Sequence, residues 1–596
     1  MPPEPAPSAQ DGARKDPPPR IGIRGAFRQL RILLRALWSS RYRNTCLLLA
    51  LGVVGVIALN MVAQVRLNTW QGDFYNAIDQ RHASELLHQT LIFLVIVAAL
   101  LLLVVGETFF RELLIVRLRE WLTRDLLDQW VTGRRPWLLG FLGDISQNPD
   151  QRLQADARHL VELTIGLAIG LLRSSLLLVG FLGVLWTLSA DTVFHLDGRN
   201  LRLPGYLVWC ALAYAIGGSW LTWRVGRPMI GLNAERYARE AELRFAMVRV
   251  SENAESIALD GGAPQERRFL EQPVDAVVAI TRRLAYALAR LTWITSGYGW
   301  LGNIVPILAA APSYFQGQLT FGGLMMAVGA FNQVQGALRW FVDNFPTIAD
   351  WRATLFRVGG LREALSGLET LTLGPGRIAR VEDPENRVVL TDLRVDLPDG
   401  GAVLAEPSIE LAPGERVLLT SPRGAGLGTV FRALAGLWPR GSGTIALPPP
   451  DRVAFLPARP YLPLGTLRTV LAYPAPADAA DFRDADLVAA LARVGLAHLV
   501  PLLDAERRWD RESDTDEQHR LVAARLLLRR PAAIVMNEPM SALDPDRREL
   551  LTDLFAKELE AATVLALGLA ARDRFYHRSV VLRHGEVDAG DRSARR

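Results

Sequence analysis

The chain has 596 residues, of which 50% are hydrophobic and 22% are charged. That length excludes a single small domain, and the composition is too apolar for a soluble or disordered chain. Only two cysteines occur, Cys46 and Cys210, so there is no disulfide framework and no cysteine metal cluster. The net charge of +5 comes from arginines that lie between apolar segments rather than in one basic stripe, which disfavours nucleic acid as a partner. We expect a membrane protein with a soluble part.

The first 43 residues divide into two segments. Residues 1–20 contain seven prolines and almost nothing that could form a core, which predicts a disordered tail without the apolar region of a signal peptide. Residues 21–43 carry arginines at helical spacing beside large apolar residues, as in an amphipathic helix at a membrane surface. We therefore predict an interfacial helix before the first membrane span.

Six apolar windows of spanning length follow within residues 44–357, and each predicts one transmembrane helix. They cover residues 46–65, 87–105, 171–188, 206–223, 291–311 and 321–338. The connections 107–159 and 224–290 are long, helical in pattern and rich in arginine, whereas the other connections are short and nearly balanced or uncharged. By the positive-inside rule, the two long connections and both termini are cytoplasmic.

The sequence pattern changes after residue 357. Residues 358–375 are predicted to form a linker, and residues 376–596 alternate short β-branched runs with helical stretches, which is typical of a soluble α/β domain. The predicted strands include 416–420, 452–456 and 533–536. The predicted fold class is therefore an α-helical membrane domain of six transmembrane helices followed by an α/β domain.

Several longer motifs resemble those of one group of transporters. They are Arg66-Leu-Asn-Thr-Trp70, Phe74-Tyr75-Asn76-Ala77, Arg117-Leu-Arg-Glu-Trp-Leu-Thr123, Asn148-Pro-Asp-Gln-Arg152, Glu252-Asn-Ala-Glu255 and Leu338-Arg-Trp-Phe-Val-Asp343. They are similar to the SbmA/BacA branch of exporter-type ABC transporters, which is related to peroxisomal fatty-acyl half-transporters, and the resemblance covers nearly everything after residue 25. It implies a fused permease and P-loop-NTPase-like ABC nucleotide-binding domain, and a homodimer or a heterodimer with another half-transporter. It also implies that the loop around 148–156 touches the nucleotide-binding domains.

The soluble domain departs from the family's pattern in the phosphate-binding loop. Such a loop needs glycines that present backbone N–H groups, a lysine for the β and γ phosphates, and a serine or threonine for Mg²⁺. Aligned on the helix 431–438, the chain has Ser421 at the first glycine, Leu427 at the lysine and Gly428 at the metal-binding hydroxyl, and Thr429 or Arg423 could compensate only in part. The candidate nucleotide-binding residues are Gly424, Ala425, Gly426, Leu427, Gly428, Thr429 and, in the intact D-loop, Asp544.

The other ATP motifs of the family are altered as well. Ala458 occupies the place of the Q-loop glutamine, and Asn537 the place of the aspartate that would hold Mg²⁺. Glu538 remains as the candidate general base, although few of the other residues that hydrolysis needs are present around it. Leu569 stands where a switch histidine is expected. No separate metal site is predicted.

The signature motif of the family is replaced by Ser513-Asp-Thr-Asp-Glu-Gln518. Asp514 and Asp516 are expected to repel a γ-phosphate that approaches from the opposite subunit. Each lost electrostatic contact typically costs about 3 to 4 kcal/mol of transition-state stabilisation, and several such losses are not additive. We predict a domain that folds and docks but binds ATP and Mg²⁺ weakly or not at all.

The functional prediction is an ABC-family transporter of a bacterial inner membrane that moves an amphipathic solute, with ATP hydrolysis impaired or lost. The solute classes that the resemblance implies are peptides, cobalamin-like molecules and fatty-acyl conjugates. Three alternatives stay open: a heterodimer with a competent half, a proton-coupled carrier, and a non-transporting scaffold. Proton coupling needs ionisable groups in the membrane domain, where Arg173 is expected only to snorkel. The candidates are Glu107, Arg111, Glu112, Glu240, Glu242, Glu252, Glu255 and Asp343.

Overall fold

The computed structural model describes residues 23–141, 149–190, 192–196, 199–371, 377–397, 400–421, 426–476, 482–537, 545–568 and 575–585. Its contacts divide the chain into two compact units. The helical unit comprises residues 1–130 and 143–363, and the C-terminal unit comprises 131–142 and 364–596. The tail 1–20, for which disorder is predicted, lies outside the described residues.

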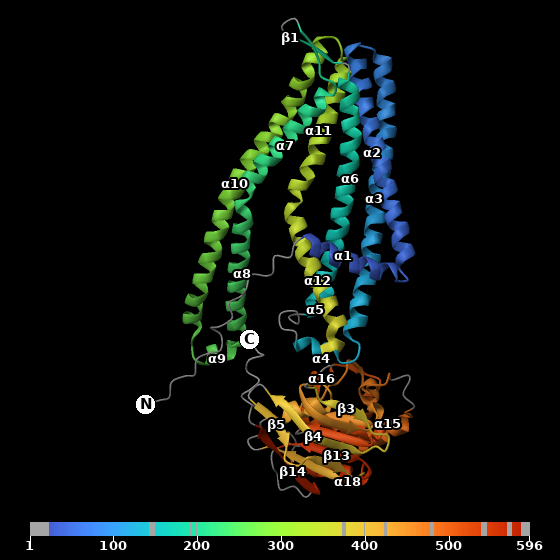
Figure 1. The fold of residues 1–596 in the computed structure, drawn as a ribbon, viewed down its shortest axis with the longest axis vertical. Coiled ribbons are helices and arrows are strands. Elements are labelled where there is room, and N and C mark those ends of the chain that lie inside the picture. The colour runs from blue at the N-terminus through green and yellow to red at the C-terminus, as the bar shows by residue number, and fades with distance from the viewer. Residues whose placement is uncertain are drawn as a thin grey trace. The chain divides into compact units, whose positions relative to one another are not determined.

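The helical unit consists mainly of long helices (Figure 1). They are α1 (Ile23–Trp38), α2 (Arg43–Asp79), α3 (Ala83–Trp130), α5 (Pro149–Gln151), α6 (Ala157–Ser189), α7 (Tyr206–Gly226), α8 (Pro228–Glu252), α9 (Ala254–Leu259), α10 (Ala263–Phe315), α11 (Phe321–Asp343) and most of α12 (Phe345–Leu371). A π-helical turn, Arg152–Asp156, joins α5 to α6. The antiparallel strands β1 (Val193–Leu196) and β2 (Arg199–Arg202) precede α7.

All six predicted membrane windows are helical, and they lie in α2, α3, α6, α7, α10 and α11. Within the described residues, three helical segments are long and apolar enough to cross a membrane: Arg43–Asp79, Ala83–Trp130 and Pro149–Ser189. Much of their apolar surface faces outward, since Leu48 and Leu102 are 70% and 74% exposed. Exposed side chains of this kind are expected where a helix contacts lipid rather than water.

The core of the helical unit lies where α6, α7, α10 and α11 meet. Phe181, Leu185, Leu207 and Phe331 are almost completely buried there. Figure 1 shows α8 and α10 running side by side, and the contacts between these two helices are extensive. The unit therefore has a packed bundle and a helix pair, α8 and α10, that extends from it.

Residues 358–371 fall within the predicted linker, yet they continue α12 to Leu371. Four of its residues, Val358, Leu361, Leu365 and Leu368, are fully buried. Their spacing places them on one face of a helix, so packing of this apolar stripe stabilises helix where the sequence prediction expects a connection. The predicted interfacial helix 21–43 corresponds to α1 and the beginning of α2.

The C-terminal unit is built around a sheet with strand order β3-β8-β4-β5-β14-β7-β13-β12-β9, and β6 pairs with β4. The strands are β3 (Ala379–Glu382), β4 (Val388–Leu397), β5 (Gly400–Leu404), β6 (Ser408–Leu411), β7 (Arg416–Thr420), β8 (Gly441–Leu447), β9 (Val453–Leu456), β12 (Ala533–Asn537), β13 (Thr563–Leu567) and β14 (Arg578–Gly585). Its main helices are α13 (Leu427–Leu434), α14 (Leu467–Ala472), α15 (Asp484–Arg493), α17 (Thr515–Arg529) and α18 (Pro545–Lys557). The three predicted strands are confirmed as β7, β9 and β12.

The central strands of this sheet are buried on both faces. In β7, Leu418 belongs to one hydrophobic cluster, whereas Val417 and Leu419 belong to another. In β12, Met536 and Val535 alternate in the same way. Side chains of a strand point alternately to opposite faces, so two apolar layers cover the sheet, as is typical of parallel strands.

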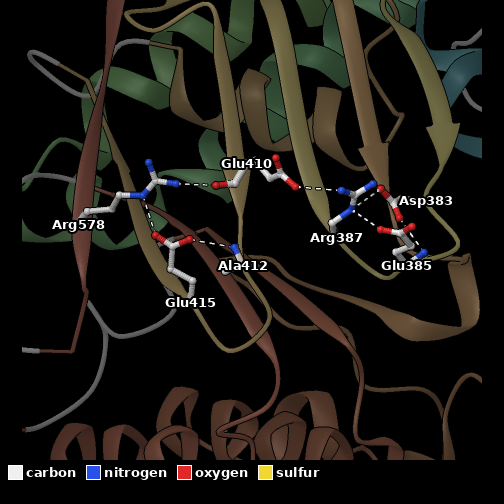
Figure 2. A network of polar contacts seen from close by, with 7 residues as sticks. All are labelled: Asp383, Glu385, Arg387, Glu410, Ala412, Glu415 and Arg578. Carbon is white, nitrogen blue, oxygen red and sulfur yellow. Dashed lines mark hydrogen bonds and ion pairs between the residues drawn. The ribbon is translucent and has the colours of Figure 1, made fainter.

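Ion pairs join strands at the surface of the sheet (Figure 2). Arg387 Nε lies 3.2 Å from Asp383 Oδ2, and Arg387 Nη1 lies 3.1 Å from Glu410 Oε1. Arg578 Nε donates to Glu415 Oε1 at 2.7 Å and its Nη2 donates to the Glu410 carbonyl at 2.7 Å. Both guanidinium groups therefore have carboxylate partners.

Candidate nucleotide-binding site

The phosphate-binding loop lies between β7 and α13. Gly426 precedes the first residue of α13 and adopts φ +82°, a left-handed conformation that favours glycine. Gly424 and Ala425 lie outside the described residues. The strand–glycine–helix arrangement is therefore present where the motif predicts it.

Leu427 is the first residue of α13, at the position that aligns with the family's lysine. Its side chain is only 3% exposed and belongs to the buried cluster that contains Leu419 and Val430. The position therefore contributes to the core and supplies no cation for a phosphate. A Cβ added at Gly428 would meet nothing within 4 Å, so there is space for the hydroxyl-bearing side chain that the motif lacks here. Thr429 donates its backbone N–H to the Gly426 carbonyl at 3.0 Å, as an ordinary first-turn residue.

The strand that ends at Asn537 lies two strands away from the phosphate loop. Leu419 of β7 pairs with Leu567 of β13, which in turn pairs with Asn537 of β12. These strands are parallel, so the loop after β7 and Asn537 emerge at the same edge of the sheet, about 10 Å apart at two strand spacings. Asn537 presents a neutral amide where a carboxylate would hold Mg²⁺, while Glu538 and Asp544 lie outside the described residues.

The acidic signature segment has structural partners that the sequence analysis did not identify. The Asp514 carboxylate accepts from the Glu517 N–H at 2.7 Å and caps α17. Asp516 Oδ2 lies 2.9 Å from Arg520 Nη2, and both side chains are nearly buried. Repulsion of a phosphate is therefore not the only role of these acids. Asp514 caps the helix, and Asp516 is neutralised by Arg520 one helical turn later. The spacing of an acid and an arginine four residues apart on a helix could have indicated this ion pair from the sequence.

One further motif position and two other residues of this unit are described. Ala458 is exposed just after β9, and its short side chain offers no polar group. His577 Nδ1 accepts from the Arg416 N–H at 3.3 Å. Arg525 of α17 donates to the Val470 carbonyl, and burial lowers its pKa to about 10. Leu569 lies outside the described residues.

A loop from between the membrane helices packs on the C-terminal unit. Arg134 Nη1 donates to the Gly436 carbonyl at 3.1 Å, and Trp137 Nε1 donates to the Leu437 carbonyl at 2.9 Å. The Arg432 guanidinium lies 5.4 Å from the centre of the Trp137 ring. Residues 131–142 belong to the C-terminal unit. The contact that the resemblance implies for 148–156 stays a prediction.

The ionisable candidates of the helical unit occupy different environments. Glu107 is 5% exposed and forms an ion pair with Arg173 across α3 and α6, so Arg173 has a protein partner rather than only snorkelling. Arg111 and Glu112 pair with each other on an exposed surface at 2.7 Å. The remaining candidates lie on exposed positions, and those with described ion pairs have partners one helical turn away: Glu240 with Arg236, Glu242 with Arg239 and Asp343 with Arg339. Glu252 and Glu255 are also exposed.

The fold and the comparison with known families together indicate a class of membrane transporter. Residues 32–315 match the family described as ABC transporter transmembrane region 2, and a strand-containing domain consistent with an ABC nucleotide-binding domain follows. Together with its relatives, this match supports the exporter-type ABC transporter family.

Three relatives are similar over almost the whole chain. The first is the inner membrane ABC transporter ATP-binding protein YddA of Escherichia coli, 27% identical over 91% of this chain and 95% of the relative. The ABC transporter D family member 2, chloroplastic, of Arabidopsis thaliana is 25% identical over 94% and 86%. The lysosomal cobalamin transporter ABCD4 of Homo sapiens is 26% identical over 90% and 91%. These likenesses support a fused ABC half-transporter.

Proposed function

We propose that the chain is a fused half-transporter of the SbmA/BacA-like branch that moves an amphipathic solute across a bacterial inner membrane, with ATP hydrolysis impaired or lost. It has six membrane spans, formed by α2, α3, α6, α7, α10 and α11, and both termini are cytoplasmic. The solute is a peptide, a cobalamin-like molecule or a fatty-acyl conjugate. The names of two relatives, an inner membrane transporter and a cobalamin transporter, are consistent with this location and with one of these classes.

The burial of Leu427 carries the proposal. A side chain that is 3% exposed and packed with the core of the sheet cannot stabilise negative charge on a transferring phosphoryl group. Losing one preorganised contact of this kind typically costs about 3 to 4 kcal/mol, or 10² to 10³ in rate. The amide of Asn537 and the helix-bound acids Asp514 and Asp516 act in the same direction, because none of them supplies a metal ligand or an anion site in the expected place.

A second copy of the chain, or another half-transporter, is the expected partner. The helix pair α8 and α10 extends from the bundle and carries large exposed apolar side chains. Phe245, Trp293 and Trp300 are 74%, 83% and 75% exposed. Trp293 and Trp300 lie in the predicted membrane window 291–311, where lipid would cover them. Phe245 lies outside the predicted windows, so a partner helix is expected to cover it.

The test is ATPase activity and nucleotide binding of the purified full chain in lipid nanodiscs. We expect neither hydrolysis nor saturable ATP binding at the phosphate loop at millimolar concentration. A variant with Leu427→Lys, Gly428→Ser and Asn537→Asp is expected to regain ATP binding, because Gly428 has room for a serine side chain. Hydrolysis by the unmodified chain that disappears with Glu538→Gln would overturn the proposal and make the protein an ATP-driven pump.

The partner is tested by mixing. If ATPase activity appears only when a second half-transporter from the same membrane is co-purified, the chain is the inactive half of a heterodimer. If solute accumulation persists after deletion of the chain, it is a scaffold rather than a transporter.

Uptake driven by a proton gradient is a second candidate, favoured by the Glu107–Arg173 pair. A carboxylate that is 5% exposed within an apolar helix is costly unless it is paired, and such groups often mark proton pathways. Vesicle uptake of radiolabelled cobalamin and of a dansylated amphipathic peptide, with and without a proton gradient, tests it. Glu107→Gln should abolish the gradient-dependent part, whereas Glu112→Gln, which changes an exposed pair nearby, should not. Equal uptake by both variants and the unmodified chain would exclude Glu107 as the coupling group.

A further inference from the structure

A cavity of about 660 Å³ lies within the C-terminal unit, between the loop 131–141 and the sheet. Its wall includes side chains from the loop, from the segment that leads into β3 and from the end of α13, and all of these belong to one compact unit. Four arginines line it: Arg134, Arg135, Arg377 and Arg380. No aspartate or glutamate is among the described residues of its wall.

Two of these arginines converge at Gly436. A Cβ placed on Gly436 would lie 1.7 Å from Arg380 Nη1 and 2.2 Å from Arg134 Nη1, so the two nitrogens are less than about 4 Å apart. Gly436 also adopts φ +70°, so both its backbone and its surroundings require glycine. Two guanidinium groups this close repel each other unless an anion lies between them. Partial desolvation and the charge of Arg134 lower the pKa of Arg380 to about 10, so Arg380 remains charged at neutral pH.

The arginines of the nearby ion-pair network are neutralised differently. Arg387 in Figure 2 lies within 3.3 Å of the carboxylates of Asp383, Glu385 and Glu410. By contrast, no ion pair joins Arg134 or Arg380 to a carboxylate in the described part of the chain. Glu382 borders a second cavity of about 440 Å³, which also touches both arginines, but it is not within ion-pair distance of either. Within the described residues, Arg134 and Arg380 therefore have no carboxylate partner at Gly436.

We propose that this cavity binds a soluble phosphate-bearing anion, held between Arg134 and Arg380, that fastens the loop 131–141 to the C-terminal unit. Guanidinium groups match phosphate oxygens with paired N–H donors. Their convergence at Gly436 supplies donors from both the loop 131–141 and β3. The volume is large enough for a diphosphate or for a larger phosphorylated metabolite. The inference does not depend on ATP hydrolysis or on the solute transported.

A soluble source is favoured over a lipid headgroup by the length of α3. This helix continues from the end of its predicted membrane window at Val105 to Trp130, roughly 37 Å at 1.5 Å per residue. The loop that follows therefore begins far along the helix from the headgroup region. Anion binding there would link the loop 131–141 to β3 and to the end of α13.

The test is calorimetric titration of pyrophosphate into the purified full chain in nanodiscs. We expect saturable binding that Arg380→Gln and Arg134→Gln each weaken at least tenfold, since each removes a charged hydrogen-bond donor. Arg380→Lys should weaken it less, because the positive charge is retained. Arg387→Gln is the matched control on the same unit and should leave the affinity unchanged.

Two comparisons separate the alternative binding sites. Gly428→Asp places a negative charge at the phosphate loop, where space is available, and should not alter pyrophosphate binding. Phosphatidylcholine and phosphatidylglycerol nanodiscs should give the same affinity. The proposal is overturned if pyrophosphate does not bind at millimolar concentration, if Gly428→Asp abolishes binding while Arg380→Gln does not, or if phosphatidylglycerol displaces it. Arg380→Lys is the conservative variant that guards against a folding defect. Affinity like that of the unmodified chain in both Arg380 variants would also contradict the proposal.

Discussion

In the C-terminal unit, Leu419 and Val535 are completely buried beneath the sheet edge at which Leu427 and Asn537 stand in the places of a lysine and an aspartate. The packing positions have the apolar side chains that a sheet buried on both faces needs. The positions that the sequence resemblance predicts to touch a nucleotide have apolar, neutral or internally paired side chains. The difference teaches that one fold can be maintained by its apolar layers while its phosphate-facing groups serve packing, capping and ion pairing, because the two sets of interactions are energetically separate.

The largest expected effect on stability comes from the buried pair Asp516–Arg520. Asp516→Ala or Arg520→Ala removes one partner of a nearly buried ion pair, which typically costs about 3 to 5 kcal/mol. For a unit of this size we expect a fall of roughly 6 to 20 °C in its melting temperature, measured by differential scanning fluorimetry in nanodiscs. The double variant should lose less than the sum of the two. Lys557→Ala breaks an exposed pair at the same helical spacing and serves as the control; an equal shift there would show that burial is not the cause.

Adjacent positions in the phosphate loop should respond in opposite directions. Leu427→Ala removes a 3% exposed side chain from the core and is expected to destabilise the unit by about 2 to 5 kcal/mol. Gly428→Ala adds a methyl group where nothing lies within 4 Å and should be stabilising by up to about 1 kcal/mol. Thermal unfolding of the two variants measures the contrast. Little loss in Leu427→Ala would mean that this side chain is free to leave the core and that the position is available to ligand.

A smaller effect is expected at the helix cap of the signature segment. Asp514→Ala removes the acceptor of the Glu517 N–H and should cost about 1 kcal/mol, or roughly 2 to 4 °C in melting temperature. Asp514→Ser should restore most of the loss, because serine caps a helix without a charge. If Asp514→Ser were as unstable as Asp514→Ala, the carboxylate would have a role other than capping.

The smallest effect is expected from the exposed pair Arg493–Glu558. Arg493 Nη2 donates to Glu558 Oε2 at 2.9 Å, and this hydrogen bond lowers the pKa of Glu558 below its usual value near 4.5. Because the folded pKa is the lower one, the contribution is present above pH 4.5 and is lost as the pH falls through the folded value. We expect less than about 1 kcal/mol, given the solvent screening. Melting temperatures of Arg493→Ala and the unmodified chain should differ at pH 7 and converge at pH 3; a constant difference would point to packing instead.

Local pattern determined much of the molecule. Apolar windows of spanning length predicted six helices, and short β-branched runs predicted β7, β9 and β12, because hydrophobic periodicity acts over neighbouring residues. Residues 431–438 resemble the helix that follows the family's phosphate loop, whereas the structure has α13 over Leu427–Leu434. The spacing of the leucines in 358–371 indicates that α12 continues through this segment, although a linker was predicted there.

Contacts between distant residues were decided only by the tertiary structure. Arg134 reaches a carbonyl 302 residues away at Gly436, and Arg173 pairs with Glu107 across two helices. The convergence of Arg134 and Arg380 at a glycine with left-handed backbone follows from how the loop 131–141 packs on the sheet. Sequence spacing carries no information about such meetings, because the distance between two side chains on different elements depends on how those elements pack, and packing is determined by the whole core.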